Sequence, residues 1–274
     1  MARTRATFLF GSAWAALACV AGAGQAFALS LSNNRPLIER EVGPGEAVQG
    51  SIEVTNTGDK PMEVRAYLED WRYLPTGEGD KEFDAPGTYP RSAAGWISFY
   101  PTEFELPPHG RGVVDYTIRV TDEAALDGGY YAVLFFESII GEVQPQGGSE
   151  VTVKYAARLG SLFMIDVTGT VRRDASLAGA RLSSAGGGAT RIEGTIVNEG
   201  NVALRCDGTY HLLGAGELVA ARGELPRRYL WVGQSAPFEA EWVGSLAPGA
   251  YSAVLTYDCG ADLILVEEAQ VSVR

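Results

Sequence analysis

Alternation of apolar and polar residues is the feature that most limits what this chain can fold into. The segment Gly112–Val120 places Val114, Tyr116 and Ile118 on one phase and mostly polar residues on the other. A period of two residues predicts a half-buried β-strand. The segment Gly129–Ile140 is apolar on both phases, which predicts a central strand that is buried on both faces.

The rest of the chain repeats this pattern in short segments that end at turn residues. Leu74–Gly95 is rich in Gly, Pro and acidic residues and is predicted to be a long surface loop. In the proline-rich corner that follows, Phe104 and Leu106 lie two residues apart, so they can close one end of a core together. The other expected strands are Ser30–Ile38, Ala47–Asn56, Met62–Trp71, Trp96–Tyr100, Glu150–Val167, Ala180–Ser183, Thr190–Asn198, Ala203–Leu213, Glu217–Gly223, Leu225–Leu230, Phe238–Trp242, Ala250–Asp258 and Leu263–Val273.

The two halves of the chain echo each other. The segment that ends in Asn56-Thr57-Gly58 resembles the one that ends in Asn198-Glu199-Gly200. Many short strands with regular turns predict an immunoglobulin-like sandwich of about 100 residues. We therefore expect an all-β chain with two immunoglobulin-like β-sandwich domains in tandem, over residues 29–165 and 166–274.

The first 28 residues read as a secretory signal peptide. Arg3 and Arg5 precede an apolar run too short to span a bilayer comfortably, and Ala26-Phe27-Ala28 is a cleavage signal. A competing interpretation makes Cys19 a lipidation site. No later apolar run reaches membrane-spanning length, so we expect no transmembrane anchor after cleavage, and a periplasmic or secreted location.

The acidic charge argues against nucleic acid as a partner. The net charge is −12 and becomes −14 once Arg3 and Arg5 are removed, whereas phosphate binding needs a basic surface. Cleavage leaves Cys206 and Cys259, an even pair in an oxidising compartment, and we predict that they form a disulfide. The alternative is two buried free thiols.

No motif indicates catalysis. The histidines, His109 and His211, stand outside any metal-ligand pattern, and no nucleophile elbow, phosphate loop or dinucleotide fingerprint is present. We expect no enzyme, no metal and no cofactor, with a hydrolase as the least favoured hypothesis. The aromatic residues suggest a weaker hypothesis of glycan stacking. They are Trp71, Tyr73, Tyr89, Trp96, Tyr100, Trp231 and Trp242.

The stretch Glu150–Leu162 carries a more specific pattern. Val151, Val153 and Tyr155 share one face with Ala157 and Leu159, while Lys154 and Arg158 lie on the other. A sheet edge with alternating apolar residues can pair with a partner strand, and basic side chains beside it can meet a carboxylate.

Several segments, taken in order, carry a family resemblance. They are the secretory signal, Ser30-Leu31-Ser32-Asn33-Asn34-Arg35, Ile52–Asn56, Tyr67–Trp71, Pro101–Pro108, the loop before Glu150 and the strand through Arg158. Over residues 29–165 the chain resembles the periplasmic pilus-assembly, PapD-like chaperones and related bacterial envelope proteins.

The resemblance implies a function as well as a fold. A PapD-like chaperone binds a secreted or pilus-type subunit by β-strand addition and works with an outer-membrane usher. Arg35 and Arg158 would bind the carboxylate of the partner, and Val151, Val153 and Tyr155 would contact its strand. The alternative is a structural or adhesive envelope module of immunoglobulin-like domains without chaperone activity.

Overall fold

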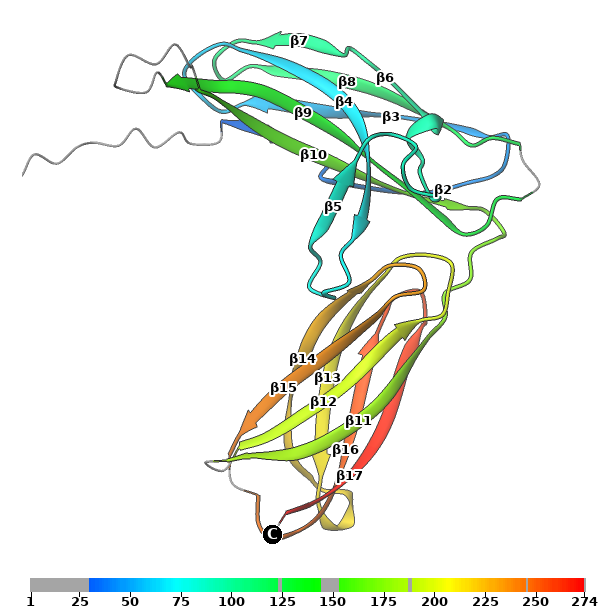
Figure 1. Ribbon diagram of the computed structural model, residues 1–274, viewed down its shortest axis with the longest axis vertical. Helices are drawn as coiled ribbons and strands as arrows, with labels where there is room; N and C mark the ends of the chain where they lie inside the picture. Colours follow the sequence, from blue (N-terminus) through cyan, green and yellow to red (C-terminus); the bar gives the residue numbers. More distant parts are fainter. Residues whose placement is uncertain (1–29, 123–124, 144–152, 187–188, 245, 274) are drawn as a thin grey trace, which may run out of the picture.

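The computed structural model describes residues 30–122, 125–143, 153–186, 189–244 and 246–273. The predicted signal peptide, Cys19 and Val151 lie outside these residues. The described chain forms two β-sandwiches, one above the other in Figure 1. This confirms the predicted fold class of two tandem all-β sandwich domains.

The first domain packs a four-stranded sheet against a six-stranded sheet. The first sheet has the order β1-β3-β8-β6, and the second has the order β2-β10-β9-β4-β5 with β7 beside β4. The strands are β1 (Leu31–Asn33), β2 (Leu37–Val42), β3 (Ala47–Asn56), β4 (Met62–Tyr73), β5 (Lys81–Asp84), β6 (Ile97–Tyr100), β7 (Glu103–Leu106), β8 (Arg111–Arg119), β9 (Gly129–Val143) and β10 (Val153–Val167).

The N-terminal segment of the first domain passes from one sheet to the other. β1 pairs with β3 in the first sheet, and β2 then pairs in parallel with β10 in the second. The sequence predicted a single interrupted strand over Ser30–Ile38. Asn34-Arg35-Pro36 instead separates two strands in different sheets, because proline has no N–H to continue the first ladder.

β9 is the central strand that the sequence predicted. Leu134 and Phe136 point into the core between the sheets, and Val133 and Phe135 point to the opposite face. All four side chains are buried. Phe104 and Leu106 belong to the core or pack against it, as expected.

The second domain also packs two sheets together, and both of its sheets are antiparallel, with the orders β11-β12-β15 and β14-β13-β16-β17. Its strands are β11 (Ala175–Gly186), β12 (Ala189–Asn198), β13 (Leu204–Leu213), β14 (Val219–Leu230), β15 (Ser235–Val243), β16 (Gly249–Asp258) and β17 (Ile264–Val273). Cys206 on β13 and Cys259 after β16 are buried and joined by a disulfide, which confirms the predicted pairing.

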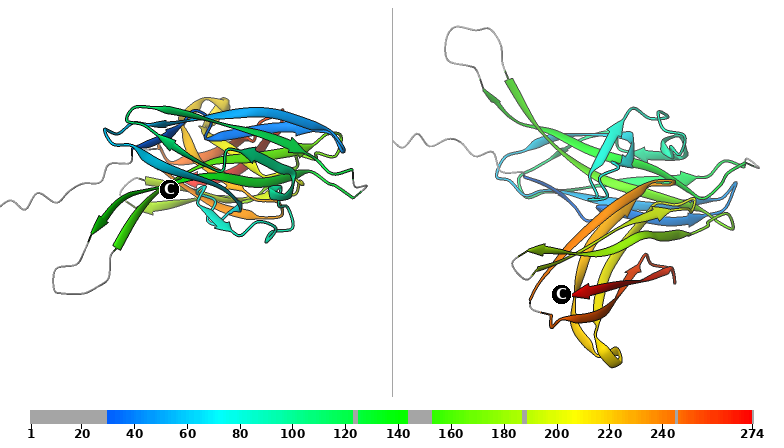
Figure 2. Two further views of the ribbon diagram at one scale, coloured as in Figure 1. Left: turned by 90° about the horizontal axis from the view of Figure 1, so that it is seen from above. Right: turned by 60° about the horizontal axis from the view of Figure 1, so that its bottom comes forward.

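The prediction of a plain surface loop over Leu74–Gly95 was wrong. The stretch contains β5, which pairs with the end of β4, and the short 3₁₀ turn η1 (Ala94–Trp96) begins within it. Figure 1 shows this hairpin extending from the first sandwich towards the second domain, and the left view of Figure 2 shows it projecting from the edge of the first sandwich. Phe83 anchors β5, with its ring centroid 5.0 Å from that of Phe135.

Candidate functional site

The edge of β10 is the candidate binding site. β10 pairs with β9 from Val153 to Asp166, but β2 covers its other edge only from Leu162 onward. Among the described residues, no strand pairs with this edge between Ala156 and Ser161. A strand edge without a neighbour is a template for another chain.

The direction of the backbone groups on this edge follows from two hydrogen bonds. The Leu162 N–H donates to the Pro36 carbonyl at 2.9 Å, and the Gly160 carbonyl accepts from Asn33 Nδ2 at 3.3 Å. Because successive residues in a strand alternate in the edge they address, Ala156 and Arg158 also present their N–H and C=O groups here. Ala157 and Leu159 direct theirs to β9.

From Ala157 to Leu159 the side chains alternate as the sequence predicted: Ala157 is buried and Leu159 packs against the first core, whereas Arg158 is exposed. Tyr155 was predicted to share the face of Ala157 but is 45% exposed, because a β-bulge between Tyr155 and Ala156 shifts the register of the strand. The structure describes the backbone of Val153. Of the three residues predicted to contact a partner strand, Tyr155 is therefore the one whose described side chain reaches the surface.

Arg158 is already engaged within the first domain. Its Nη1 lies 3.1 Å from Glu69 Oε1, and its guanidinium lies 3.9 Å from the ring centroid of Phe135. Partial burial opposes the charge of Arg158, but the hydrogen bond with Tyr67 and the nearby carboxylates of Glu69 and Glu137 raise its pKa. Arg158 therefore stays charged while its charge is balanced by Glu69.

Arg35 is placed differently. It is exposed between β1 and β2 and makes no hydrogen bond or ion pair with any residue that the structure describes. Its neighbour Pro36 lies beside Leu162, four residues along β10 from Arg158, which corresponds to about 13 Å of strand. The structure thus places the two predicted carboxylate-binding residues at different points along β10.

Sequence reasoning missed a polar pair at the covered end of this edge. Asn33 Nδ2 donates to Ser161 Oγ at 3.1 Å, and Ser161 is fully buried. The signal in the sequence was a serine within an apolar run, at Leu159–Ile165. This pair marks the end of the uncovered part of the β10 edge, because Asn33 Nδ2 also donates to the Gly160 carbonyl.

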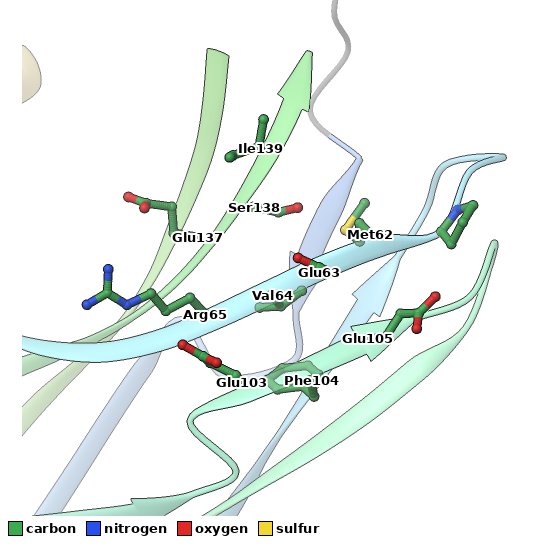
Figure 3. A pocket seen from close by; sticks show the side chains of 11 residues that line it. Met62, Glu63, Val64, Arg65, Glu103, Phe104, Glu105, Glu137, Ser138 and Ile139 are labelled. Atoms are coloured by element: carbon green, nitrogen blue, oxygen red, sulfur yellow. The ribbon is translucent and has the colours of Figure 1, made fainter. Parts of the chain in front are cut away.

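A groove of about 790 Å³ lies on the other side of β9, where β4 and β9 diverge. Their pairing ends at Arg65 and Glu137, although both strands continue (Figure 3). Figure 3 shows Glu63, Glu103 and Glu105 around this groove, and within the described residues none of the three forms an ion pair.

Two features leave polar groups of this groove without partners among the described residues. Glu63 lies directly opposite Glu105 across the β4–β7 pair, which places like charges side by side. Ser138 lines the groove and is 3% exposed, and its buried Oγ has no hydrogen-bond partner among the residues that the structure describes. The facing carboxylates make the groove suited to a cationic occupant, whereas the Ser138 hydroxyl is too buried to reach one.

The aromatic residues do not form an exposed platform. Trp71 is 1% exposed and Tyr73 is 7% exposed, and both pack with Trp231 between the domains. This overturns the hypothesis that these three residues stack on glycan. Among the described residues, no group of His, Cys, Asp and Glu is placed to hold a metal ion. No helix in the described part of the chain is long and apolar enough to cross a membrane.

Comparison with known proteins returned matches among solved structures. No family model matches the chain. No curated protein matches it in sequence either. The similar structures include CfaA, a class 5 fimbriae chaperone, with 10% identity over 89% of this chain and all of that chain, at a TM-score of 0.48.

Two further matches are of the same kind. One is a chain of the Salmonella enterica SafA pilin–SafB chaperone complex, with 10% identity over 90% of this chain and 97% of that chain, at a TM-score of 0.40. The other is the Pseudomonas aeruginosa CupB2 chaperone, with 10% identity over 88% and 98% of the two chains, at a TM-score of 0.37. All three are named as chaperones or chaperone complexes, the family that the sequence resembles.

Proposed function

We propose that this protein is a periplasmic chaperone-like protein that binds a secreted or pilus-type subunit by β-strand addition. The observation that carries the proposal is the edge of β10 between Ala156 and Ser161, which no described strand covers. A partner strand would hydrogen-bond to the outward N–H and C=O groups of Ala156 and Arg158. Such backbone bonds supply affinity, and the alternating side chains of the partner supply register.

In this proposal Arg35 contributes an unbalanced positive charge beside the covered end of the edge. A carboxylate of the partner would meet it there, because charge-assisted hydrogen bonds are the stronger kind. Arg158 would take part by exchanging Glu69 for the partner carboxylate or by holding the outer face of β10 in place. Tyr155, with Val151 and Val153 beyond it, would contact the partner strand.

Two adjacent alanines test strand addition. Ala156→Pro removes an N–H that points to the open edge, whereas Ala157→Pro removes one that bonds to β9. We expect the Ala156→Pro variant to keep a near-wild-type unfolding midpoint. It should not capture from periplasmic extract the secreted subunit that the wild type captures, and mass spectrometry identifies that subunit. Ala157→Pro should instead lower the unfolding midpoint by several degrees. Equal capture of that subunit by wild type and Ala156→Pro protein would refute strand addition at this edge.

Arg35→Ala tests the carboxylate contact separately. Because Arg35 has no ion pair to lose within the described residues, the variant should fold as well as the wild type. Loss of a charge-assisted contact worth about 2 kcal/mol would weaken binding of the captured subunit by a factor of about 30. Unchanged affinity in Arg35→Ala and in Arg158→Lys would remove both residues from the site. The alternative, a structural or adhesive envelope module, predicts that no variant changes which proteins are captured.

The groove between β4 and β9 supports a second protein contact, of the kind that a usher would make. Its carboxylates favour a segment that carries Lys or Arg. Glu105→Lys places a cation opposite Glu63, so it should stabilise the fold by about 0.5 kcal/mol while weakening this contact. Binding of a lysine-rich peptide, measured by calorimetry, should fall in Glu105→Lys and persist in Ala156→Pro.

A further inference from the structure

The tip of the β4–β5 hairpin, residues 74–80, reaches the second domain. The Tyr229 N–H donates to the Gly77 carbonyl at 3.0 Å, and Gln234 Nε2 donates to the Tyr73 carbonyl at 3.4 Å. At Gly77, whose φ is +73°, a Cβ would lie 2.5 Å from the Cβ of Ala236. The tip therefore fits against β14 and β15 with no room for a side chain at this position.

Aromatic side chains from both domains form a cluster at the base of this hairpin. The ring centroid of Trp231 lies 4.3 Å from Tyr131, 5.6 Å from Trp71 and 6.2 Å from Tyr73. Tyr73 also lies 5.2 Å from Tyr229. Packed aromatic pairs stabilise a fold beyond the area they bury, so this cluster is a third core, shared between the domains.

A second set of contacts lies where the chain passes between the domains. The Ala203 N–H donates to the Tyr131 hydroxyl at 2.6 Å, and the Gly129 N–H donates to the Asn201 carbonyl at 3.0 Å. Asn201 Nδ2 reaches Asp127 Oδ1 at 2.6 Å. The second domain is thus held at the start of β9 as well as at the hairpin tip, on two sides of the aromatic cluster.

We propose that residues 74–80 are an interdomain clamp that fixes the angle between the two sandwiches and makes them unfold as one unit. Two tandem domains that touch only at a linker would move relative to each other. Here a hairpin attached to the first domain, a shared aromatic core and the Asn201 contacts oppose that motion. The clamp is made within this chain and does not depend on the function proposed above.

The clamp also limits where a partner can lie. Leu162 and Met164 on the outer face of β10 pack against the aromatic cluster, so the second domain covers that face beyond Leu162. The second domain would therefore limit how far along β10 a partner strand can extend. It would not close over the bound partner, because the clamp holds it in place.

Two glycines provide a matched test. Gly77 and Gly87 both have positive φ, at +73° and +82°, so alanine costs backbone strain at either position. Of these two positions, only at Gly77 would the new Cβ meet the second domain, since no atom of the described residues lies within 4 Å of a Cβ added at Gly87. The difference between Gly77→Ala and Gly87→Ala therefore reports the clamp.

The measurements are differential scanning calorimetry and small-angle X-ray scattering on the full mature chain. We expect one unfolding transition for the wild type and for Gly87→Ala, and two transitions with a larger radius of gyration for Gly77→Ala. Gly79→Ala, whose Cβ would lie 2.7 Å from the Tyr229 ring, should give a smaller effect in the same direction. Two transitions in the wild type, or identical behaviour of Gly77→Ala and Gly87→Ala, would overturn the proposal.

Discussion

At the scale of single residues, two buried asparagines make matching hydrogen bonds in the two domains. Asn56 Nδ2 donates to the carbonyls of Lys60, Leu106 and Pro107, and Asn198 Nδ2 donates to those of Val202, Leu230 and Trp231. The side-chain oxygen of each accepts from the glycine two residues later. The similar segments that the sequence shows in the two halves thus place an asparagine that hydrogen-bonds to backbone carbonyls at one end of each sandwich.

Replacing either asparagine should be costly. Asn198→Ala leaves buried carbonyls without donors, and we expect it to lower the free energy of unfolding by about 3 kcal/mol, with a similar loss for Asn56→Ala. Urea denaturation measures this loss. Asn34→Ala is the control, because the exposed Asn34 accepts a single hydrogen bond, from the Glu53 N–H. A loss below 1 kcal/mol in Asn198→Ala would contradict this account.

Tyr73 makes stability depend on alkaline pH. Burial raises its pKa from 10.0 to about 12. A group whose pKa is higher in the folded state contributes stability that is complete below pH 10 and is lost as pH rises towards 12. Two pKa units correspond to about 3 kcal/mol. Urea midpoints at pH 8, 10 and 11 should therefore fall less steeply in Tyr73→Phe than in the wild type, whereas Tyr100→Phe, at an exposed site, should match the wild type.

At the scale of elements, the disulfide ties β13 to the end of β16. Cys206 and Cys259 are 53 residues apart, and a loop of that length corresponds to about 4 kcal/mol of lost chain entropy in the unfolded state. The double variant Cys206→Ala, Cys259→Ala should lose stability of that order relative to the oxidised wild type in guanidinium denaturation, and should match the reduced wild type. Labelling of both cysteines by a thiol reagent in unfolded, unreduced protein would show that the bond is absent in solution.

The strands that the sequence located well are those with clear alternation. β3, β8 and β9 begin and end within about three residues of their predicted limits, because period-two patterns and turn residues act locally. β5 was missed, since Phe83 stands alone among charged neighbours and only its contact with Phe135 makes it part of a sheet.

The candidate site was partly predictable. The facing of Ala157 and Leu159 follows from alternation, but the Arg158–Glu69 pair does not.

At the scale of the whole molecule, the second domain covers surface that the first would otherwise expose. Trp71, Tyr73 and Tyr131 are buried in the aromatic cluster shared with Trp231. We expect a truncated chain that ends at residue 168 to bind a hydrophobic dye more strongly than the chain that includes the second domain, and to unfold at a lower temperature. Trp231→Ala in the full chain should move both readouts the same way, whereas Trp242→Ala, within the second core, should leave the dye signal unchanged.

The sequence by itself determined that this chain is all-β, that it forms two sandwiches and that Cys206 and Cys259 pair. Alternation, turn residues and cysteine count are local properties, so they can be read without knowing which strands meet. Only the tertiary structure decided which edge of β10 stays uncovered, that Glu69 balances Arg158, and that the hairpin joins the domains. These depend on residues far apart in the chain, such as Tyr73 and Gln234 at a separation of 161, which no local pattern brings together.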